Sequence, residues 1–224
     1  MSHLVDIFVQ PGKAWAELKE QPTFWLPLLL IAVSSALMVL VYYLQVDPEW
    51  AVDQAVLAAT GDRSPAEADQ MRSMMPAAKT MGYFGAVSAL VASFVMTAIF
   101  ALYFMLAGKV AGASLSFRHG MSLVSWSSMP MLLGTIVVIV GALTMAPRTS
   151  LESLQLLNVD PLFLQLDRDH PWSAVAKGFS LLNFWTWFLL ALGWKTWTRS
   201  GWVASILVAV LPGLVVFGLM ALLA

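Results

Sequence analysis

The chain has 224 residues, of which 59% are apolar and 11% are charged, whereas soluble domains carry about 45–50% apolar and about 25% charged residues. So few charged groups cannot cover a water-soluble globule, and a disordered chain would need the opposite composition. The formal net charge of −1 gives no basic surface for nucleic acid, and the absence of cysteine excludes disulfides and thiol chemistry. The composition therefore indicates an integral membrane protein.

The first twenty residues predict a broken amphipathic helix. Leu4, Ile7, Trp15 and Leu18 recur near helical spacing with charged residues between them, and Pro11 interrupts the pattern. Such a segment is expected to lie in the plane of the membrane interface. The alternative is a solvated tail. Acidic residues before the first apolar run argue against a cleavable signal peptide.

Long runs without charge predict five transmembrane helices. A helix needs about 20 apolar residues to cross about 30 Å of hydrocarbon, and consecutive apolar positions do not fit the alternating pattern of membrane β-strands. The predicted fold class is an all-α integral membrane protein, with 1–224 as a single membrane domain. The domain comprises an interfacial segment, 1–20, and spans at about 23–46, 80–108, 120–146, 175–195 and 200–223.

The fourth span is the shortest, because Lys177 and Lys195 enclose its uncharged run. It crosses only if both lysine side chains reach the headgroups. The alternative is a buried hairpin or a re-entrant segment.

An odd number of spans puts the two termini on opposite sides of the membrane. Each side then carries six of the twelve Lys and Arg residues, but the side with the N-terminus spreads them over shorter connections. Because Lys and Arg in short loops favour the cytoplasm, we expect a cytoplasmic N-terminus and a C-terminus outside. The long connections 47–79 and 148–177 would lie outside.

Prolines and small residues predict how the helices bend and pack. Pro130 and Pro212 should kink the third and fifth spans, and serines beside Pro130 are expected to bond the carbonyls that it frees. Gly82 and Gly85 on the second span should let a neighbouring helix approach closely.

Short motifs along the chain resemble those of one family. They are Phe8, Pro11 and Trp15 in a Phe-x-x-Pro-x-x-x-Trp entry, the stretch 22–25 before the first span, the serine-rich stretch 125–130 ending in proline, and 183–187 with Gly193. Together they resemble the bacterial branch of the Yip-domain family, the Ypt/Rab-interacting protein family. The chain has Asn183 where the family's fourth span often has aspartate.

The resemblance implies a five-helix integral membrane domain, here in the bacterial inner membrane. For eukaryotic relatives it implies partnership with small GTPases. A small GTPase is a partner of this chain only by analogy with the family. For bacterial relatives it implies no settled activity.

No catalytic, cofactor-binding or metal-binding residues are predicted. His3, His119 and His170 lie in tail or loop segments without metal-ligand spacing. The confident parts of the spans contain no ionisable side chain, although such groups usually mark proton relays and substrate sites in membranes. We therefore expect no enzyme and no cofactor.

Polar, uncharged residues remain as candidate positions for ligand binding or helix packing. They are Ser125, Ser128, Pro130 and Asn183, and packing is the favoured interpretation. Asn183 is the position most open to ligand contact, because a buried amide needs hydrogen-bond partners.

The preferred function is a non-enzymatic membrane scaffold or adaptor that binds other membrane proteins or influences bilayer organisation. The alternative is a channel or transporter for a small or lipid-like solute, since interrupted helices are typical of transport sites. Expected partners are the lipid bilayer, other membrane proteins and a second copy of the chain, and nucleic acid is not expected.

Overall fold

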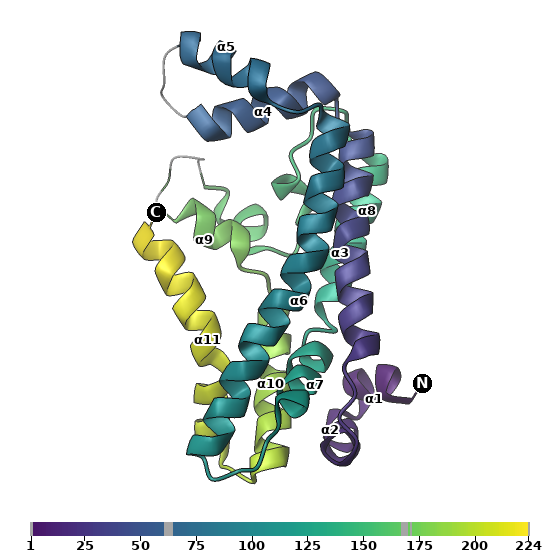
Figure 1. Cartoon of the computed structure of the whole chain (residues 1–224), viewed down its shortest axis with the longest axis vertical. Coiled ribbons are helices and arrows are strands. Elements are labelled where there is room, and N and C mark those ends of the chain that lie inside the picture. Colours follow the sequence, from purple (N-terminus) through teal and green to yellow (C-terminus); the bar gives the residue numbers. More distant parts are fainter. Residues whose placement is uncertain (1, 61–64, 167–169, 171, 224) are drawn as a thin grey trace.

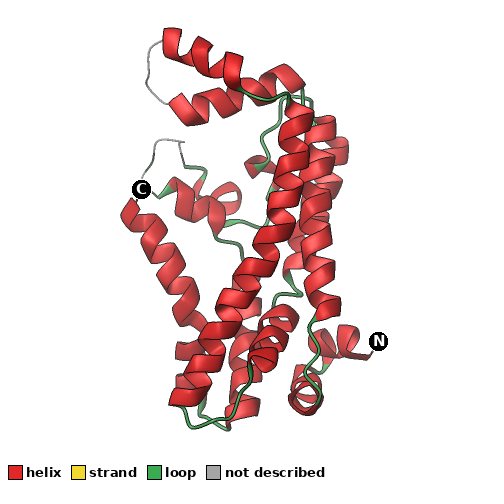
Figure 2. Ribbon diagram, viewed as in Figure 1, coloured by secondary structure: helices red, strands yellow, loops and turns green. Residues whose placement is uncertain are grey.

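A computed structural model of the chain describes residues 2–60, 65–166, 170 and 172–223. Helices hold 81% of the residues, and loops between them are mostly short (Figure 2). Within the described residues no strand forms, and the single β-bridge joins Asn158 to Ser180. The predicted all-α fold is confirmed.

Three helices pack along one side of the molecule: α3 (Trp25–Gln45), α6 (Ala78–Val110) and α8 (Met131–Thr144), with α3 in contact with both others (Figure 1). The α3–α6 contact depends on small residues. A Cβ placed on Gly82 would lie 2.7 Å from the Cβ of Tyr43, and one on Gly85 would lie 2.9 Å from Val39. The close approach predicted at these glycines is therefore confirmed.

A second group of helices surrounds the main apolar core: α7 (Phe117–Ser127), α10 (Leu182–Thr198) and α11 (Trp202–Leu223), with α1 (Ser2–Val9) and α2 (Pro11–Glu20) at one end. α7 is buried from Gly120 to Ser127. α11 starts near the end that holds α2 and runs away from it, so its last turn lies beside α9 (Ser173–Gly178) (Figure 1).

The N-terminal segment forms two helices that break at Pro11, as its pattern predicts. The apolar side chains Ile7, Trp15 and Leu18 are fully buried, and they pack into the core around α10 rather than standing free for lipid. The indole N–H of Trp197 donates to the Trp15 carbonyl at 2.7 Å, and the Lys19 ammonium donates to the Trp197 carbonyl at 2.8 Å. The segment is thus part of the folded core, and its position in the interface plane stays a prediction.

Pro130 divides the predicted third span. α7 and α8 are separated by a break and bend by 46° relative to each other. Pro130 frees the carbonyl of Trp126, four residues earlier. We expected a serine hydroxyl to bond it, but it accepts from the Met129 backbone N–H. Ser128 donates to the Val124 carbonyl at 2.9 Å. Pro212 lies within α11, which continues through it as one helix.

The predicted fourth span starts later than the sequence indicates. α9 ends at Gly178, and α10 begins at Leu182 after a bend held by two backbone bonds, from Val159 to the Phe179 carbonyl and from Leu181 to the Leu157 carbonyl. α10 has 17 residues, about 25 Å at 1.5 Å per residue. Three described helices, α3, α6 and α11, are long and apolar enough to cross a membrane, and the bent α7–α8 pair makes four.

The remaining elements cover the end opposite α2. α4 (Pro48–Thr60) and α5 (Pro65–Met74) pack together across that end (Figure 1), and Arg72 pairs with Asp53 at 2.6 Å. The connection after α8 contains two short helical turns, η1 (Glu152–Leu154) and η2 (Asp160–Leu164), before α9.

Candidate functional site

A cavity of about 280 Å³ lies where α6, α10 and α11 diverge. α6 supplies Met96, Phe100 and Phe104 at four-residue spacing, so that they share one helix face. α11 supplies side chains from Ala209 to Phe217 on the opposite side. None of the described residues that line the cavity is charged. Its surface is therefore mainly apolar and aromatic.

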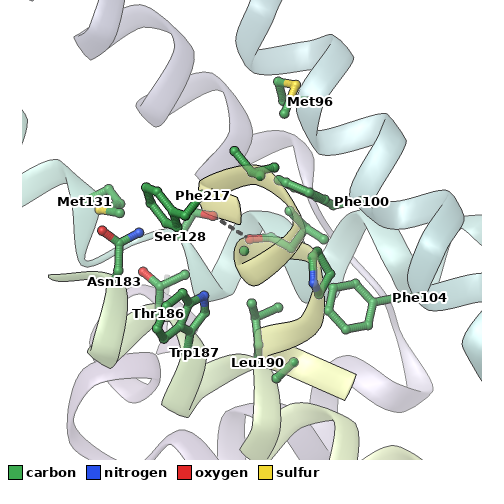
Figure 3. Close-up of a pocket in the computed structure, with 15 residues that line it drawn as sticks. Met96, Phe100, Phe104, Ser128, Met131, Asn183, Thr186, Trp187, Leu190 and Phe217 are labelled. Carbon is green, nitrogen blue, oxygen red and sulfur yellow. Dashed lines mark hydrogen bonds between the residues drawn. The ribbon is translucent and has the colours of Figure 1, made fainter. Parts of the chain in front are cut away.

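Three polar side chains form one part of the lining: Ser128, Asn183 and Thr186, with Phe100 and Phe104 across the cavity from them (Figure 3). Ser128 donates its hydroxyl hydrogen to the Val124 carbonyl, as the dashed line in Figure 3 marks. The Asn183 side-chain oxygen accepts from the Ser180 backbone N–H at 2.7 Å. The Thr186 hydroxyl is buried and has no hydrogen-bond partner among the described residues.

Pro212 and its surroundings shape the α11 side of the cavity. Pro212 has no N–H, so the carbonyl four residues earlier, at Val208, loses its usual helical donor. The Tyr103 hydroxyl of α6 donates to that carbonyl at 2.9 Å. One residue later, a Cβ on Gly213 would lie 2.8 Å from the Trp187 ring, so α11 and α10 approach closely here. These contacts hold α6, α10 and α11 together on one side of the cavity.

A second cavity of about 210 Å³ lies behind the polar part of the first. Met131 and Asn183 line both cavities. The second cavity is more polar, with Gln155, Asn158 and Ser180 among its lining residues. Met131 and Asn183 therefore contact both the apolar space between the helices and the space beside residues 155–158 of the connection after α8.

The structure brings together two of the four residues that the sequence analysis selected. Ser128 and Asn183 line the first cavity, whereas Ser125 and Pro130 do not. Ser125 is 1% exposed and lies in the interior of α7. Pro130 precedes α8 and sets the bend between the two helices.

Thr186 and Trp187 are two of the lining residues that the sequence analysis did not select as candidates. Thr186 follows Asn183 by three positions, so both side chains share one face of α10. That spacing was a usable signal. The position of Trp187 against Gly213 depends on tertiary packing and had no local signal.

α7 contains three serines whose hydroxyls are buried without a hydrogen-bond partner among the described residues: Ser122, Ser125 and Ser127. Each is 1% exposed or less. Small side chains let α7 sit close to its neighbours, which agrees with the packing interpretation of the serine-rich stretch. A Cβ on Gly120 would press into the Ala101 backbone, so α6 and α7 are nearly in backbone contact.

The histidines lie outside the cavity. Ser116 caps α7: its hydroxyl oxygen accepts from the His119 backbone N–H, and the His119 ring contacts Ser116 in return. His3 lies beside Asp6 and Glu17, with potential ligand atoms all within 4.8 Å of one another. The ammonium of Lys13 already lies 3.4 Å from Asp6 and 4.0 Å from Glu17. The group is therefore an ion-pair network that joins α1 to α2.

Comparison with known proteins gives the family. The Yip1-domain family model matches residues 5–223. The chain is similar to "Membrane protein YknW" of Bacillus subtilis (strain 168), with 26% identity over 208 residues that cover 91% of this chain and 84% of that protein. No solved structure matches the chain. With a match over nearly its whole length and long apolar helices, the chain belongs to the Yip1-domain family of multi-pass membrane proteins.

Proposed function

We propose that this protein is a non-enzymatic membrane scaffold or adaptor that binds other membrane proteins or influences bilayer organisation. The observation that carries the proposal is the mainly apolar cavity, in which no described lining residue is charged. Transport of ions or polar solutes depends on polar or ionisable groups inside the membrane, and this cavity offers only three uncharged ones. Apolar side chains on α6 and α11 are extensively exposed and suited to contact lipid or another helix.

The proposal includes five membrane crossings within one membrane domain of the inner membrane. We assign one of the five crossings to α10, although its 17 residues are too few to establish a crossing by length alone. Leu189, Ala191 and Trp194 are buried, so one face of α10 packs against other helices, whereas Phe184 and Phe188 are exposed on another face. Charged residues near its ends can extend toward the headgroups. Five crossings put the two termini on opposite sides of the membrane, and the Lys and Arg residues in the short connections on the N-terminal side favour a cytoplasmic N-terminus and a C-terminus outside.

The absence of catalysis is part of the same proposal. A serine or threonine nucleophile needs an adjacent general base or a metal ion. Thr186 and Ser128 share the cavity with Asn183 and apolar side chains, and an amide is not a general base. The geometry supports binding rather than chemistry.

A lipid-like solute is the second candidate, and one observation favours it. Met131 and Asn183 alone are shared between the apolar cavity and the more polar one behind it. A rotamer change at these two side chains would connect the two spaces, from the apolar cavity to residues 155–158 between η1 and η2. A transporter for a polar solute gains no such support.

Photo-crosslinking in cells, paired with flux in liposomes, tests the two candidates. A photoreactive residue is introduced at Val87 of α6 or Leu207 of α11, which are 63% and 66% exposed. The scaffold predicts discrete protein adducts from at least one position, while purified protein in liposomes moves neither fluorescent lipid nor small solutes. Flux in liposomes without protein adducts in cells would contradict the scaffold proposal and support the transporter.

A further inference from the structure

We infer that the cavity between α6, α10 and α11 binds one acyl chain of a neutral diacyl lipid, with an ester carbonyl held by Thr186 and Asn183. The inference rests on the membrane location in the proposed function and names a ligand for that protein. It does not depend on whether the protein acts as a scaffold.

The polar part of the cavity has hydrogen-bond donors to spare. The Thr186 hydroxyl has no partner among the described residues, and the residue is only 9% exposed. The hydroxyl oxygen itself has almost no accessible surface, so the side chain has to turn about χ1 to present the hydroxyl to a ligand. The Asn183 side-chain oxygen accepts from the Ser180 backbone N–H, and the nitrogen of the same amide is turned toward Ser128 and Phe217 (Figure 3). Ser128 already donates its hydroxyl hydrogen to the Val124 carbonyl. Because buried donors require acceptors, the missing partner is an acceptor such as a carbonyl oxygen.

The charge of the lining decides which acceptor fits. No described lining residue carries a positive charge, and an unpaired anion in an apolar site is strongly disfavoured. A phosphate headgroup would therefore stay outside. Pro212 lies ten residues after the start of α11 and eleven before its end, so the cavity is near mid-depth of the helix, far from the charged ends. An uncharged ester suits this depth.

The surroundings of the cavity decide the source of the ligand. Ile99 of α6 and Val215 of α11 flank the lining residues and are each 52% exposed. In a membrane protein such surfaces face hydrocarbon, so the occupant enters from the bilayer rather than from water. The cavity of about 280 Å³ is slightly below the roughly 300–1,000 Å³ of pockets for whole small molecules. It accommodates one chain segment and its ester, while the rest of the lipid remains in the bilayer.

Native mass spectrometry of the purified, delipidated full-length protein tests the inference. The probes are dioleoylglycerol, dioleoylphosphatidylglycerol and squalene, which supply an uncharged ester lipid, a charged ester lipid and a chain without oxygen. We expect a one-to-one adduct with dioleoylglycerol in preference to the other two. Thr186→Val and Asn183→Leu should each weaken it by about tenfold, the loss of one hydrogen bond.

Thr196→Val is the matched control. Thr196 lies on α10 outside the cavity lining and donates to the Leu192 carbonyl at 2.8 Å, so its replacement should leave lipid binding unchanged. The melting temperature of the lipid-free protein is a second readout. Thr186→Val should keep or raise it, because the variant removes a buried hydroxyl without a partner, whereas a hydroxyl with a structural role would lower it.

Three outcomes would overturn the inference: equal binding of squalene, dioleoylglycerol binding that is insensitive to both cavity variants, or a lipid-free dimer that excludes the lipid. The last would assign the cavity to a second copy of the chain. If the protein does not bind dioleoylglycerol but still forms protein adducts in cells, the scaffold proposal remains and only the lipid inference is wrong. Lipid binding with flux and no adducts would overturn the scaffold alone.

Discussion

At the scale of single residues, a tyrosine of one helix supplies the hydrogen bond that a proline removes from another. Pro212 leaves the Val208 carbonyl without its helical donor, and the Tyr103 hydroxyl supplies a replacement at 2.9 Å. In a lipid environment no water is available to take that role. The bond therefore fixes α6 to α11 beside the cavity.

Tyr103→Phe removes this donor and is expected to lower the free energy of unfolding by about 1 kcal/mol. The cost should nearly disappear in a Pro212→Ala background, because the restored backbone N–H bonds the Val208 carbonyl. A double-mutant cycle on thermal unfolding in detergent measures the coupling. Equal costs in both backgrounds would show that the two residues act independently.

A glycine in α7 sets the distance between two helices. A Cβ on Gly120 would press into the Ala101 backbone of α6, so Gly120→Ala must push α6 and α7 apart. Overpacking of this kind costs about 1–3 kcal/mol and should lower the melting temperature. Gly218→Ala is the matched control, because a Cβ there meets nothing within 4 Å. Similar melting temperatures for the two variants would contradict the close contact.

The sequence predicted part of the candidate site from polar residue types. Ser128 and Asn183 line the cavity, but Ser125, three residues earlier on α7, is buried away from it. The difference depends on where α7 ends and on which helices surround it. Thr186, whose buried hydroxyl has no partner among the described residues, was assigned to helix packing, because a threonine in an apolar run is typical of packing until its partners are known.

At the scale of elements, the N-terminal helices show how an amphipathic pattern leaves the choice of partner open. The apolar face predicted for the interface covers α10, with Trp15 and Trp197 in edge-to-face contact at 5.5 Å between ring centroids. Pro130 gave a local signal for the break between α7 and α8. The late start of α10 had none, because it depends on the bridge from Asn158 to Ser180, 22 positions along the chain.

Trp197→Phe is expected to loosen α2 while the helices remain folded. The variant keeps most of the ring packing and removes the 2.7 Å bond to the Trp15 carbonyl, at a cost of about 1 kcal/mol. Amide hydrogen exchange in α2 should then accelerate by roughly fivefold. Trp202→Phe is the control, since Trp202 is 44% exposed and stacks on Phe188. Unchanged exchange in α2 would mean that the bond from Trp197 to the Trp15 carbonyl does not hold α2 in place.

At the scale of the whole molecule, the number of crossings decides which surfaces share a compartment. The N-terminal helices, the α6–α7 connection and the α10–α11 connection lie at one end of the long axis, and α4 and α5 lie at the other (Figure 1). A short α10 is compatible with this arrangement because its neighbours bury Leu189, Ala191 and Trp194. If α10 failed to cross, the α10–α11 connection would share a compartment with α5.

Cysteine labelling tests the topology directly, and the chain contains no cysteine to remove first. Gly12→Cys, Ser73→Cys and Gly201→Cys place single thiols at exposed positions in α2, in α5 and before α11. With five crossings, a membrane-impermeant maleimide added to intact cells should label only the α5 position, and all three should react after permeabilisation. Because a missing α10 crossing moves Gly201 to the side of Ser73, labelling of both in intact cells would reduce the count to four.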